Sequence, residues 1–332
     1  MAWFVKFKGT EDPDLDRLSV GFIGAGNHAS KVHYPSLSKM EDVDLVSVCS
    51  RTREKAEKAA RTYGVPRTYT DFKQMVDKER LDAVYVITQP EDLTKIALHC
   101  LSKRKNVFME KPPGVSLEET KKMALVAEKN DCKTMVGFNR RFMPVMTEAS
   151  RILASEGTPV NLCVAQFYRG LRGEPKDVVL IKNTIHAVDT LRSIEGEVRK
   201  VVSCLETVEG NYGHIFRILL EFENKARGVL IASYVSASKV ERYEMGSRDA
   251  YAVVDAPGKA VVHLKGRTEP LVFSGEELAG THERHRLEGF YQESRHFIEC
   301  VKRDEMPETS LQDSVKTMEL VETIVRSSQP LL

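Results

Sequence analysis

The sequence lacks the features that mark secreted, membrane-spanning and zinc-binding proteins. Its six cysteines include no C-x-x-C pair and have none of the spacings typical of metal ligands. No apolar run approaches the ~20 residues that a membrane helix needs, and lysines interrupt the apolar residues at the start of the chain. We therefore expect a cytoplasmic protein with reduced, mostly buried thiols, no membrane association and no metal site.

An excess of charge of one sign is also missing. Lys and Arg number 49 against 48 for Asp and Glu, which gives a formal net charge of +1. Such a chain has no long-range field to attract nucleic acid or anionic lipid, so any partner must be recognised locally. Hydrophobic residues at 42% and charged residues at 29% are typical of globular proteins, and 332 residues favour two domains.

Two patterns of hydrophobicity divide the chain. Up to about residue 137, short apolar runs alternate with helical stretches, which predicts βαβ units and a parallel sheet; longer extended segments follow. In the first part, strands are expected at 18–23, 45–49, 68–69, 83–87, 107–109 and 134–137, and helices at 53–62, 71–78, 92–102 and after 116. In the second part, strands are expected at 160–168, 198–207, 214–222, 226–236, 240–246, 251–255 and 260–264, and helices at 286–302 and 311–327.

The first strand runs into a turn with the pattern G-x-G-x-x-A, from Gly24 to Ala29, and then into a helical stretch. Gly24 permits the tight turn, and Gly26 lets a pyrophosphate reach the backbone. Ala29 allows the helix to pack closely on the strand, so that N–H groups around Asn27 and His28 face the phosphates. This order predicts a dinucleotide site; the alternative is a glycine turn without a ligand.

The expected fold class is therefore α/β. An N-terminal Rossmann domain that binds NAD(P) is expected at residues 1–140, with an extension of unknown role at 1–18. A C-terminal α+β domain, built on a largely antiparallel sheet, is expected at 141–332 for substrate binding and oligomerisation.

The end of the second strand favours NADP over NAD. An NAD site usually places Asp or Glu there, whereas a 2′-phosphate requires cations and hydroxyl donors. Ser50 and Arg51 provide these groups, with Arg53 or Lys55 as possible helpers. The alternative is a solvated basic helix start, which leaves NAD open as the cofactor.

Further motifs carry a family resemblance. They are Phe108-Met-Glu-Lys-Pro-Pro113, Gly137-Phe-Asn-Arg-Arg-Phe142, Ile185-His-Ala-Val-Asp-Thr-Leu-Arg192 and Ser294-Arg-His-Phe-Ile298. In this order and spacing, the chain resembles the glucose-fructose oxidoreductase / inositol dehydrogenase / rhizopine catabolism (Gfo/Idh/MocA) family over roughly residues 19–328. The resemblance implies an NAD(P)-dependent dehydrogenase or reductase that acts on a sugar, a cyclitol or a related polyol or keto-sugar.

Lys111 and His186 are the expected catalytic residues. Lys111 stands at the carboxyl end of a parallel strand, where open α/β sheets place their ligands. The resemblance implies that Lys111 polarises the reacting C–O group and that His186 exchanges its proton. The alternatives are an ion pair of Lys111 with Glu110 and a packed core position for His186.

The resemblance also suggests neighbours for these two residues. Asp189, one helical turn after His186, is expected to orient its ring or bind substrate hydroxyls. Glu110 and the turn Thr88-Gln89-Pro90 are expected beside the cofactor.

The chain departs from the family pattern at two positions. Lys182 stands where many relatives have aspartate; it either disables the usual acid/base pair or offers a cation to an acidic substrate, with Asn183 as a further hydrogen-bonding group. Leu93 stands where relatives commonly have histidine, which is expected to affect packing near the nicotinamide.

Other polar residues are ambiguous. Arg140 or Arg141 faces the substrate or forms an interdomain salt bridge, and Tyr168 ends a strand that could face the substrate. His282 and His285 are expected in a polar loop rather than a metal site, and His33 is expected to be structural.

Two other classes of function remain open. One is a non-catalytic, cofactor-sensing regulator of the same fold; the other is a hydrolase or lyase that retains NAD. The small-molecule dehydrogenase is the leading hypothesis, assembled as a homodimer or homotetramer through the C-terminal sheet.

Overall fold

The computed structural model describes residues 17–170, 173–209 and 213–329, which form two compact units. Unit 1 comprises Met1–Pro113, Lys122–Gly137 and Phe290–Leu311, and unit 2 comprises Gly114–Lys121, Phe138–Gly289 and Gln312–Leu332. The boundary predicted at residue 140 lies near the change of unit at Phe138, and unit 1 also includes the later segment Phe290–Leu311. Residues 1–16 of the predicted extension lie outside the described residues.

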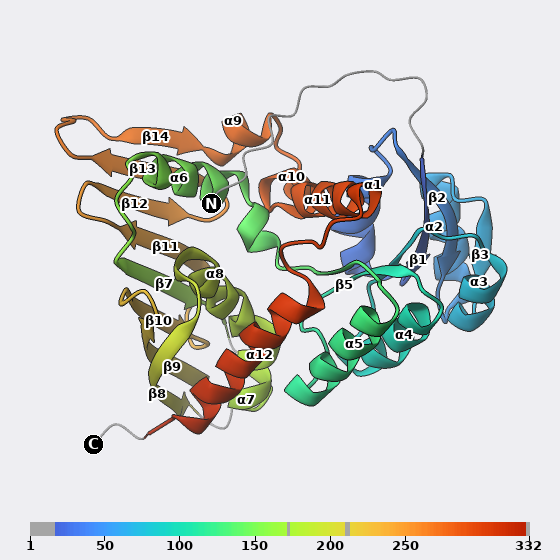
Figure 1. Cartoon of the computed structure of the whole chain (residues 1–332), viewed down its shortest axis with the longest axis horizontal. Coiled ribbons are helices and arrows are strands. Elements are labelled where there is room, and N and C mark those ends of the chain that lie inside the picture. Colours follow the sequence, from blue (N-terminus) through green and yellow to red (C-terminus); the bar gives the residue numbers. More distant parts are fainter. Residues whose placement is uncertain (1–16, 171–172, 210–212, 330–332) are drawn as a thin grey trace. The chain divides into compact units, whose positions relative to one another are not determined.

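Unit 1 contains a six-stranded parallel sheet in the order β3-β2-β1-β4-β5-β6 (Figure 1). Its strands are β1 (Leu18–Ile23), β2 (Val43–Cys49), β3 (Arg67–Tyr69), β4 (Ala83–Val86), β5 (Asn106–Met109) and β6 (Thr134–Val136). Strand order reverses between β1 and β4, and in open α/β sheets ligands bind at the carboxyl ends of strands at such a point. The predicted Rossmann domain is confirmed.

Helices connect these parallel strands. They are η1 (Ala29–His33), α1 (Tyr34–Leu37), α2 (Arg53–Tyr63), α3 (Phe72–Lys78), α4 (Pro90–Ser102) and α5 (Leu117–Lys129). Side chains cap two of the predicted helix starts: the Asp71 carboxylate accepts from the N–H of Lys73 at 2.9 Å, and the Ser116 hydroxyl accepts from the N–H of Glu119 at 3.2 Å. Local capping residues therefore fixed these helix starts.

A helix from the end of the chain completes unit 1. α11 (Phe290–Arg303) packs on η1 and α1, because it buries a strongly apolar face. Its Arg295 and Lys302 donate to the carboxylate of Asp42 at 2.6 and 2.7 Å. Burial would raise the pKa of Asp42, but these two cations outweigh burial and lower it. These long-range contacts attach a helix from near the end of the chain to unit 1.

Unit 2 contains an eight-stranded sheet in the order β14-β13-β12-β11-β7-β10-β9-β8. Its strands are β7 (Leu162–Tyr168), β8 (Val198–Glu209), β9 (Gly213–Phe222), β10 (Arg227–Ser233), β11 (Val240–Gly246), β12 (Ala250–Asp255), β13 (Lys259–Leu264) and β14 (Leu271–Ser274). Neighbouring strands are antiparallel except β7 and β10. The predicted largely antiparallel sheet is confirmed, whereas β14 was not predicted.

Helices cover one face of this sheet (Figure 1). α6 (Pro144–Ser155) packs on β12 and β13, and α8 (Ile185–Glu195) packs on β7 and β10. The remaining helices are η2 (Asn139–Phe142), α7 (Lys176–Val179), η3 (Leu180–Thr184), α9 (Gly275–Ala279), α10 (Arg284–Leu287) and α12 (Leu311–Arg326). α8 and α12 match predicted helical segments, and α6 was not predicted.

The other face of the sheet carries exposed apolar side chains. Phe216, Ile218 and Leu220 of β9 are buried, whereas Leu219 between them is 55% exposed. Val202 of β8 lies opposite Leu219 and is also exposed. Such alternation is the mark of a sheet covered on one face only.

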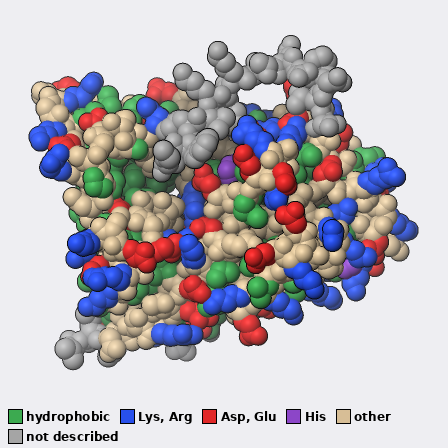
Figure 2. Space-filling model, viewed as in Figure 1, with side chains coloured by type: hydrophobic (Ala, Val, Ile, Leu, Met, Phe, Trp, Pro, Cys, Tyr) green, Lys and Arg blue, Asp and Glu red, His purple; other side chains and the backbone are tan. Residues whose placement is uncertain are grey.

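Two properties of the described residues concern the apolar length of their helices and their surface charge. None of their helices is both long and apolar enough to cross a bilayer. Figure 2 shows Lys and Arg side chains mixed with Asp and Glu over the face in view, as a net charge of +1 leads one to expect.

Candidate functional site

The turn after β1 requires glycine at its first position. Gly24 has φ +121°, and a Cβ there would lie 2.0 Å from the carbonyl oxygen of Ile87, which follows β4. The N–H of Gly24 donates to the carbonyl of Cys49 at 2.9 Å. The backbone is thus held against both neighbouring strands, which leaves no room for a side chain.

The second glycine of the turn has a different environment. A Cβ on Gly26 would meet no described protein atom within 4 Å. The residue therefore leaves open space beside the backbone, as a site for a bulky ligand requires. Ala29 is buried, in agreement with the close packing expected of the last position of the pattern.

The helical stretch after the turn begins irregularly. The N–H of Tyr34 bonds to the carbonyl of Ala29 five residues earlier, so the expected helical stretch begins with η1, a π-helical turn. Pro35 follows and has no N–H to donate, so a regular α-helical ladder cannot continue through it.

The end of β2 presents exposed polar groups. Arg51 has a side chain 82% exposed, and its guanidinium pairs with Asp92 of α4 at 2.9 Å. Ser50 accepts a hydrogen bond from the N–H of Thr52, and Lys55 is exposed on α2. Ser50, Arg51 and Lys55 therefore come from one short segment, while Asp92 is an acidic neighbour that sequence reasoning did not identify.

The turn after β4 leads directly into α4. Gln89 is extended and Pro90 occupies the first turn of the helix, where its missing N–H costs nothing. The Thr88 hydroxyl donates to the carbonyl of Gln89 at 3.4 Å. Leu93 is buried, so its side chain contributes to packing, as expected.

Glu110 joins the end of β5 to the segment that follows Gly26. Its Oε1 accepts hydrogen bonds from Nε2 of His28 at 2.9 Å and Nε2 of His33 at 2.7 Å. Burial would raise the pKa of Glu110, but the two imidazoles outweigh burial and hold it well below its usual range. The carboxylate is therefore ionised. His33 is fully buried, as expected of a structural histidine.

Lys111 follows Glu110 but does not pair with it through its amine. The contacts of Glu110 are the two imidazoles and the backbone N–H of Lys111, which donates to Oε2 at 3.2 Å. The alternative in which Glu110 holds the amine of Lys111 is therefore wrong, because the carboxylate is directed to the histidines.

In unit 2, His186 lies on the first turn of α8 and is largely buried. Arg140 of η2 donates from Nη1 to Nε2 of His186 at 3.3 Å. A guanidinium has only donors, so Nε2 is the acceptor and the neutral ring carries its proton on Nδ1. This contact requires the fold, because the two residues are 46 positions apart.

Arg140 belongs to a buried ion cluster that sequence reasoning missed. Glu241 of β11 accepts two hydrogen bonds from Arg140, at 2.8 and 3.1 Å, and one from Arg169 at 2.5 Å. Burial would raise the pKa of Glu241, but the two guanidinium groups outweigh burial and lower it to about 2. Glu241 thus holds Arg140 in place beside His186.

Asp189 does not orient His186, and that prediction was wrong. Its carboxylate accepts two hydrogen bonds from Arg141, at 2.8 and 2.6 Å, and one from the hydroxyl of Thr317 at 2.9 Å. Arg141 also donates to Asp313. All four residues belong to unit 2, so the arginine forms a salt bridge within one unit rather than between domains. A buried guanidinium attracted Asp189 more strongly than the neutral ring could.

Three of the remaining predicted residues, Lys182, Asn183 and Tyr168, lie near the start of α8 or at the end of β7. Lys182 of η3 pairs with Glu174 at 3.1 Å, which offsets part of its charge, and Asn183 is half-buried beside it in the chain. Tyr168 is half-buried at the end of β7. His282 is exposed and pairs with Glu276, as expected of a polar loop.

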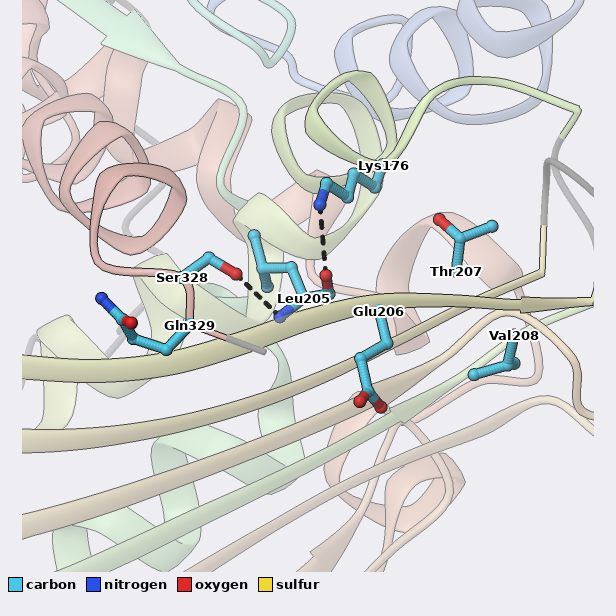
Figure 3. A pocket seen from close by; sticks show the side chains of 7 residues that line it. All are labelled: Lys176, Leu205, Glu206, Thr207, Val208, Ser328 and Gln329. Carbon is cyan, nitrogen blue, oxygen red and sulfur yellow. Dashed lines mark hydrogen bonds between the residues drawn. The ribbon is translucent and has the colours of Figure 1, made fainter. Parts of the chain in front are cut away.

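A cavity of about 380 Å³ lies elsewhere in unit 2 (Figure 3). Lys176 donates to the carbonyl of Leu205 there at 3.2 Å, and the Ser328 hydroxyl accepts from the N–H of Leu205 at 3.0 Å. None of the predicted site residues lines this cavity. It is therefore distinct from the candidate site.

Two family profiles together cover most of the chain. Residues 18–138 match the profile described as "Oxidoreductase family, NAD-binding Rossmann fold". Residues 165–330 match the one described as "Oxidoreductase family, C-terminal alpha/beta domain".

Individual proteins match over different lengths. Oxidoreductase P35 of Formosa agariphila is 30% identical over 42% of this chain, which spans only 43% of that protein. D-apiose dehydrogenase of Paraburkholderia graminis is 22% identical over 95% of this chain and 88% of its own length. Myo-inositol 2-dehydrogenase of Thermotoga maritima is 24% identical over 89% of this chain and 92% of its own length.

A solved structure shares the fold throughout. A dehydrogenase from Chromobacterium violaceum superposes with a TM-score of 0.87, with 21% identity, over 95% of this chain and 96% of that one. At this identity, the likeness shows the fold alone.

Proposed function

This chain belongs to the Gfo/Idh/MocA oxidoreductase family, and we propose that it transfers a hydride between NADP and a sugar, cyclitol or related polyol or keto-sugar. The observation that carries this proposal is the turn from Gly24 to Ala29, with its required glycine and the open space at Gly26. The matches to a D-apiose dehydrogenase and a myo-inositol 2-dehydrogenase support a polyhydroxylated substrate.

The cofactor-binding residues come from the ends of four strands of unit 1. They are Gly24, Gly26, Asn27, His28, Ser50, Arg51, Lys55, Thr88, Gln89, Pro90, Glu110 and Lys111. NADP is proposed over NAD because the end of β2 offers a hydroxyl and an exposed guanidinium, whereas an NAD site usually has a carboxylate at this place. Arg51 can exchange Asp92, a partly exposed partner, for a 2′-phosphate without leaving a buried charge unpaired.

The chemistry on the protein side requires an acid/base group and a polarising group. When bound, the nicotinamide supplies or accepts the hydride. We assign the proton to Nε2 of His186: a substrate hydroxyl that takes the place of Arg140 at this atom would give up its proton there during oxidation and recover it during reduction. The amine of Lys111 stabilises the negative charge that develops on the reacting oxygen.

Substrate contacts outside the reacting group are assigned to Tyr168, Lys182 and Asn183. The ion pair with Glu174 leaves Lys182 as a directional hydrogen-bond donor rather than a strong anion site, which favours a neutral polyol over a uronate. Arg141 and Asp189 are left out, because they neutralise each other in the interior of unit 2.

Self-association through the open face of the eight-stranded sheet is part of the proposal. Val202, Leu219 and Ile231 expose apolar surface on neighbouring strands. A second copy of the same face would bury these side chains, and homo-oligomers commonly form in this isologous way. The six cysteines are buried thiols, which fits a cytoplasmic enzyme.

The test of this function is a pair of titrations followed by a substrate screen. Nicotinamide fluorescence should report saturable binding of NADPH, with weaker binding of NADH. Turnover of at least one sugar or cyclitol in the preferred cofactor should follow. Tight NADPH binding without turnover of any polyol would instead favour the regulator, and a nicotinamide that stays bound through purification would favour the hydrolase or lyase.

A further inference from the structure

We propose that His28, His33 and Glu110 form a binding site for a divalent transition-metal ion of the zinc class. Nε2 of each histidine lies within hydrogen-bond distance of the same carboxylate oxygen, at 2.9 and 2.7 Å. The three ligand atoms all lie within 4.8 Å of one another. Two imidazole nitrogens and one carboxylate oxygen are a ligand set that zinc uses in proteins.

The charge of this cluster suits a cation. The carboxylate of Glu110 is only 9% exposed and contacts both imidazoles, so it faces the ring nitrogens rather than solvent. A neutral imidazole offers one lone pair to a metal. A bound divalent ion would take the place of the protons between Nε2 and the carboxylate, and each ring would keep one proton on Nδ1.

The spacing of the ligand atoms is close to what a metal requires. In tetrahedral zinc sites with bonds of about 2.1 Å, neighbouring ligand atoms lie about 3.4 Å apart. The present distances of 2.9 Å for His28 and 2.7 Å for His33 are shorter, so a bound ion would move both rings away from Oε1 by roughly half an ångström or slightly more. The side chain of His28 is 46% exposed, so it has room to move, and solvent can supply the fourth ligand.

Two of the three ligands are supported by neighbouring groups. The His33 ring packs edge-on against the rings of Phe108 and Phe290. The second oxygen of Glu110 accepts from the N–H of Lys111 at 3.2 Å. A Cβ on Gly137 would lie 3.3 Å from Oε1, so glycine at this position leaves space for the carboxylate. Such support from outside the ligand set raises the affinity of metal sites.

The proposal differs from the sequence-based expectation of no metal site. Glu110 is 82 positions from His28 and 77 from His33, so no short-range pattern in the sequence predicts the cluster. It also involves a residue of the turn that is proposed to receive the dinucleotide, but it does not depend on the cofactor.

The test uses the full-length chain, free of nucleotide and dialysed against a chelator. We expect isothermal titration with zinc chloride to give one tight site. Titration with cobalt chloride should produce the visible absorption of a four-coordinate ion. His28→Ala should lower zinc affinity by at least about tenfold and abolish the cobalt bands, while its circular dichroism stays unchanged because this residue is half-exposed.

Two control variants separate this cluster from other ligands. His282→Ala removes an exposed histidine of unit 2, and His296→Ala removes the ring that lies 3.6 Å from the sulfur of Cys300. Both should retain wild-type zinc affinity. The proposal is overturned if the wild-type chain takes up no ion, if His28→Ala binds zinc as the wild type does, or if His296→Ala removes the site.

Discussion

Nη1 of Arg140 lies 3.3 Å from Nε2 of His186, and the arginine is itself anchored by Glu241. The guanidinium donates to the lone pair of Nε2, so the ring is held by a residue outside its own helix. The neighbours of His186 on that helix, Ile185 and Ala187, are buried.

The first prediction concerns His186 itself. His186→Ala should lower kcat by roughly 10²- to 10⁴-fold, because the proton then has no positioned acceptor. The Kd for NADPH should be nearly unchanged. His263→Ala, which removes an exposed histidine of β13, should keep full activity. Full turnover by His186→Ala would contradict the assigned mechanism.

The second prediction separates the two glycines of the turn. Gly26→Ala should retain the thermal stability of the wild type, because a Cβ there meets no described protein atom within 4 Å. It should weaken NADPH binding by at least about tenfold, or ~1.4 kcal/mol, if the pyrophosphate occupies that space. Fluorescence titration and differential scanning calorimetry measure the two effects.

Gly24→Ala is the matched comparison for that variant. Its Cβ would lie 2.0 Å from the carbonyl oxygen of Ile87, and its φ of +121° disfavours any side chain. We expect it to lose stability as well as affinity. Unchanged NADPH binding by Gly26→Ala would place the dinucleotide elsewhere.

The third prediction concerns the choice of cofactor. Arg51→Glu should raise the Kd for NADPH by about tenfold or more, while the Kd for NADH changes little, because only the 2′-phosphate is repelled. Arg61→Glu introduces the same charge change on an exposed side chain at the other end of α2 and serves as the control. Equal effects of Arg51→Glu on both cofactors would argue against NADP specificity.

The fourth prediction concerns acid stability. The pKa of Glu241 in the folded chain is about 2, below its ordinary value of 4.5, so the ionised group stabilises the fold above pH 4.5. That contribution should be lost as the pH falls from about 4.5 to about 2. Urea denaturation at several pH values should show this slope.

Glu241→Gln should remove much of that slope and destabilise unit 2 at neutral pH. The loss should be roughly 3 to 5 kcal/mol, because two buried guanidinium groups lose their counter-ion. Glu244→Gln on the same strand, whose partner is the hydroxyl of Tyr251, should have a small effect. Similar losses for both variants would refute the special role of the cluster.

The fifth prediction concerns assembly. Leu219→Lys places a charge on the open face of the sheet, and burying that charge between two copies of the chain is unfavourable. The variant should therefore dissociate and show a lower sedimentation coefficient in analytical ultracentrifugation. Leu125→Lys on α5 changes another exposed leucine and should leave the assembly intact. A wild-type chain that sediments as a monomer would exclude this interface.

Local signals identified most elements of the fold. Continuous apolar runs predicted the parallel strands, and Asp71 and Ser116 marked helix starts because capping is a local interaction. The π-helical turn before Pro35 and the strand β14 gave no comparable signal. The short strand 271–274 contains no buried residue and lies at the edge of its sheet.

The candidate site could be predicted from the sequence only where its residues lie close together along the chain. The turn at Gly24 and the segment after Cys49 were recognisable because each is contiguous. By contrast, Asp189 was misjudged, because helical spacing gave its distance from His186 but not the presence of Arg141.

The sequence by itself determined the alternation of strands and helices, the position of the glycine turn and the types of residue offered to a cofactor, since these depend on neighbours along the chain. Only the tertiary structure decided which charges meet. The pairing of Arg140 with His186, of Arg141 with Asp189 and of two histidines with Glu110 joins residues 46 to 82 positions apart. The energy of a buried charge depends on the partner that packing brings to it, and that partner has no local signature.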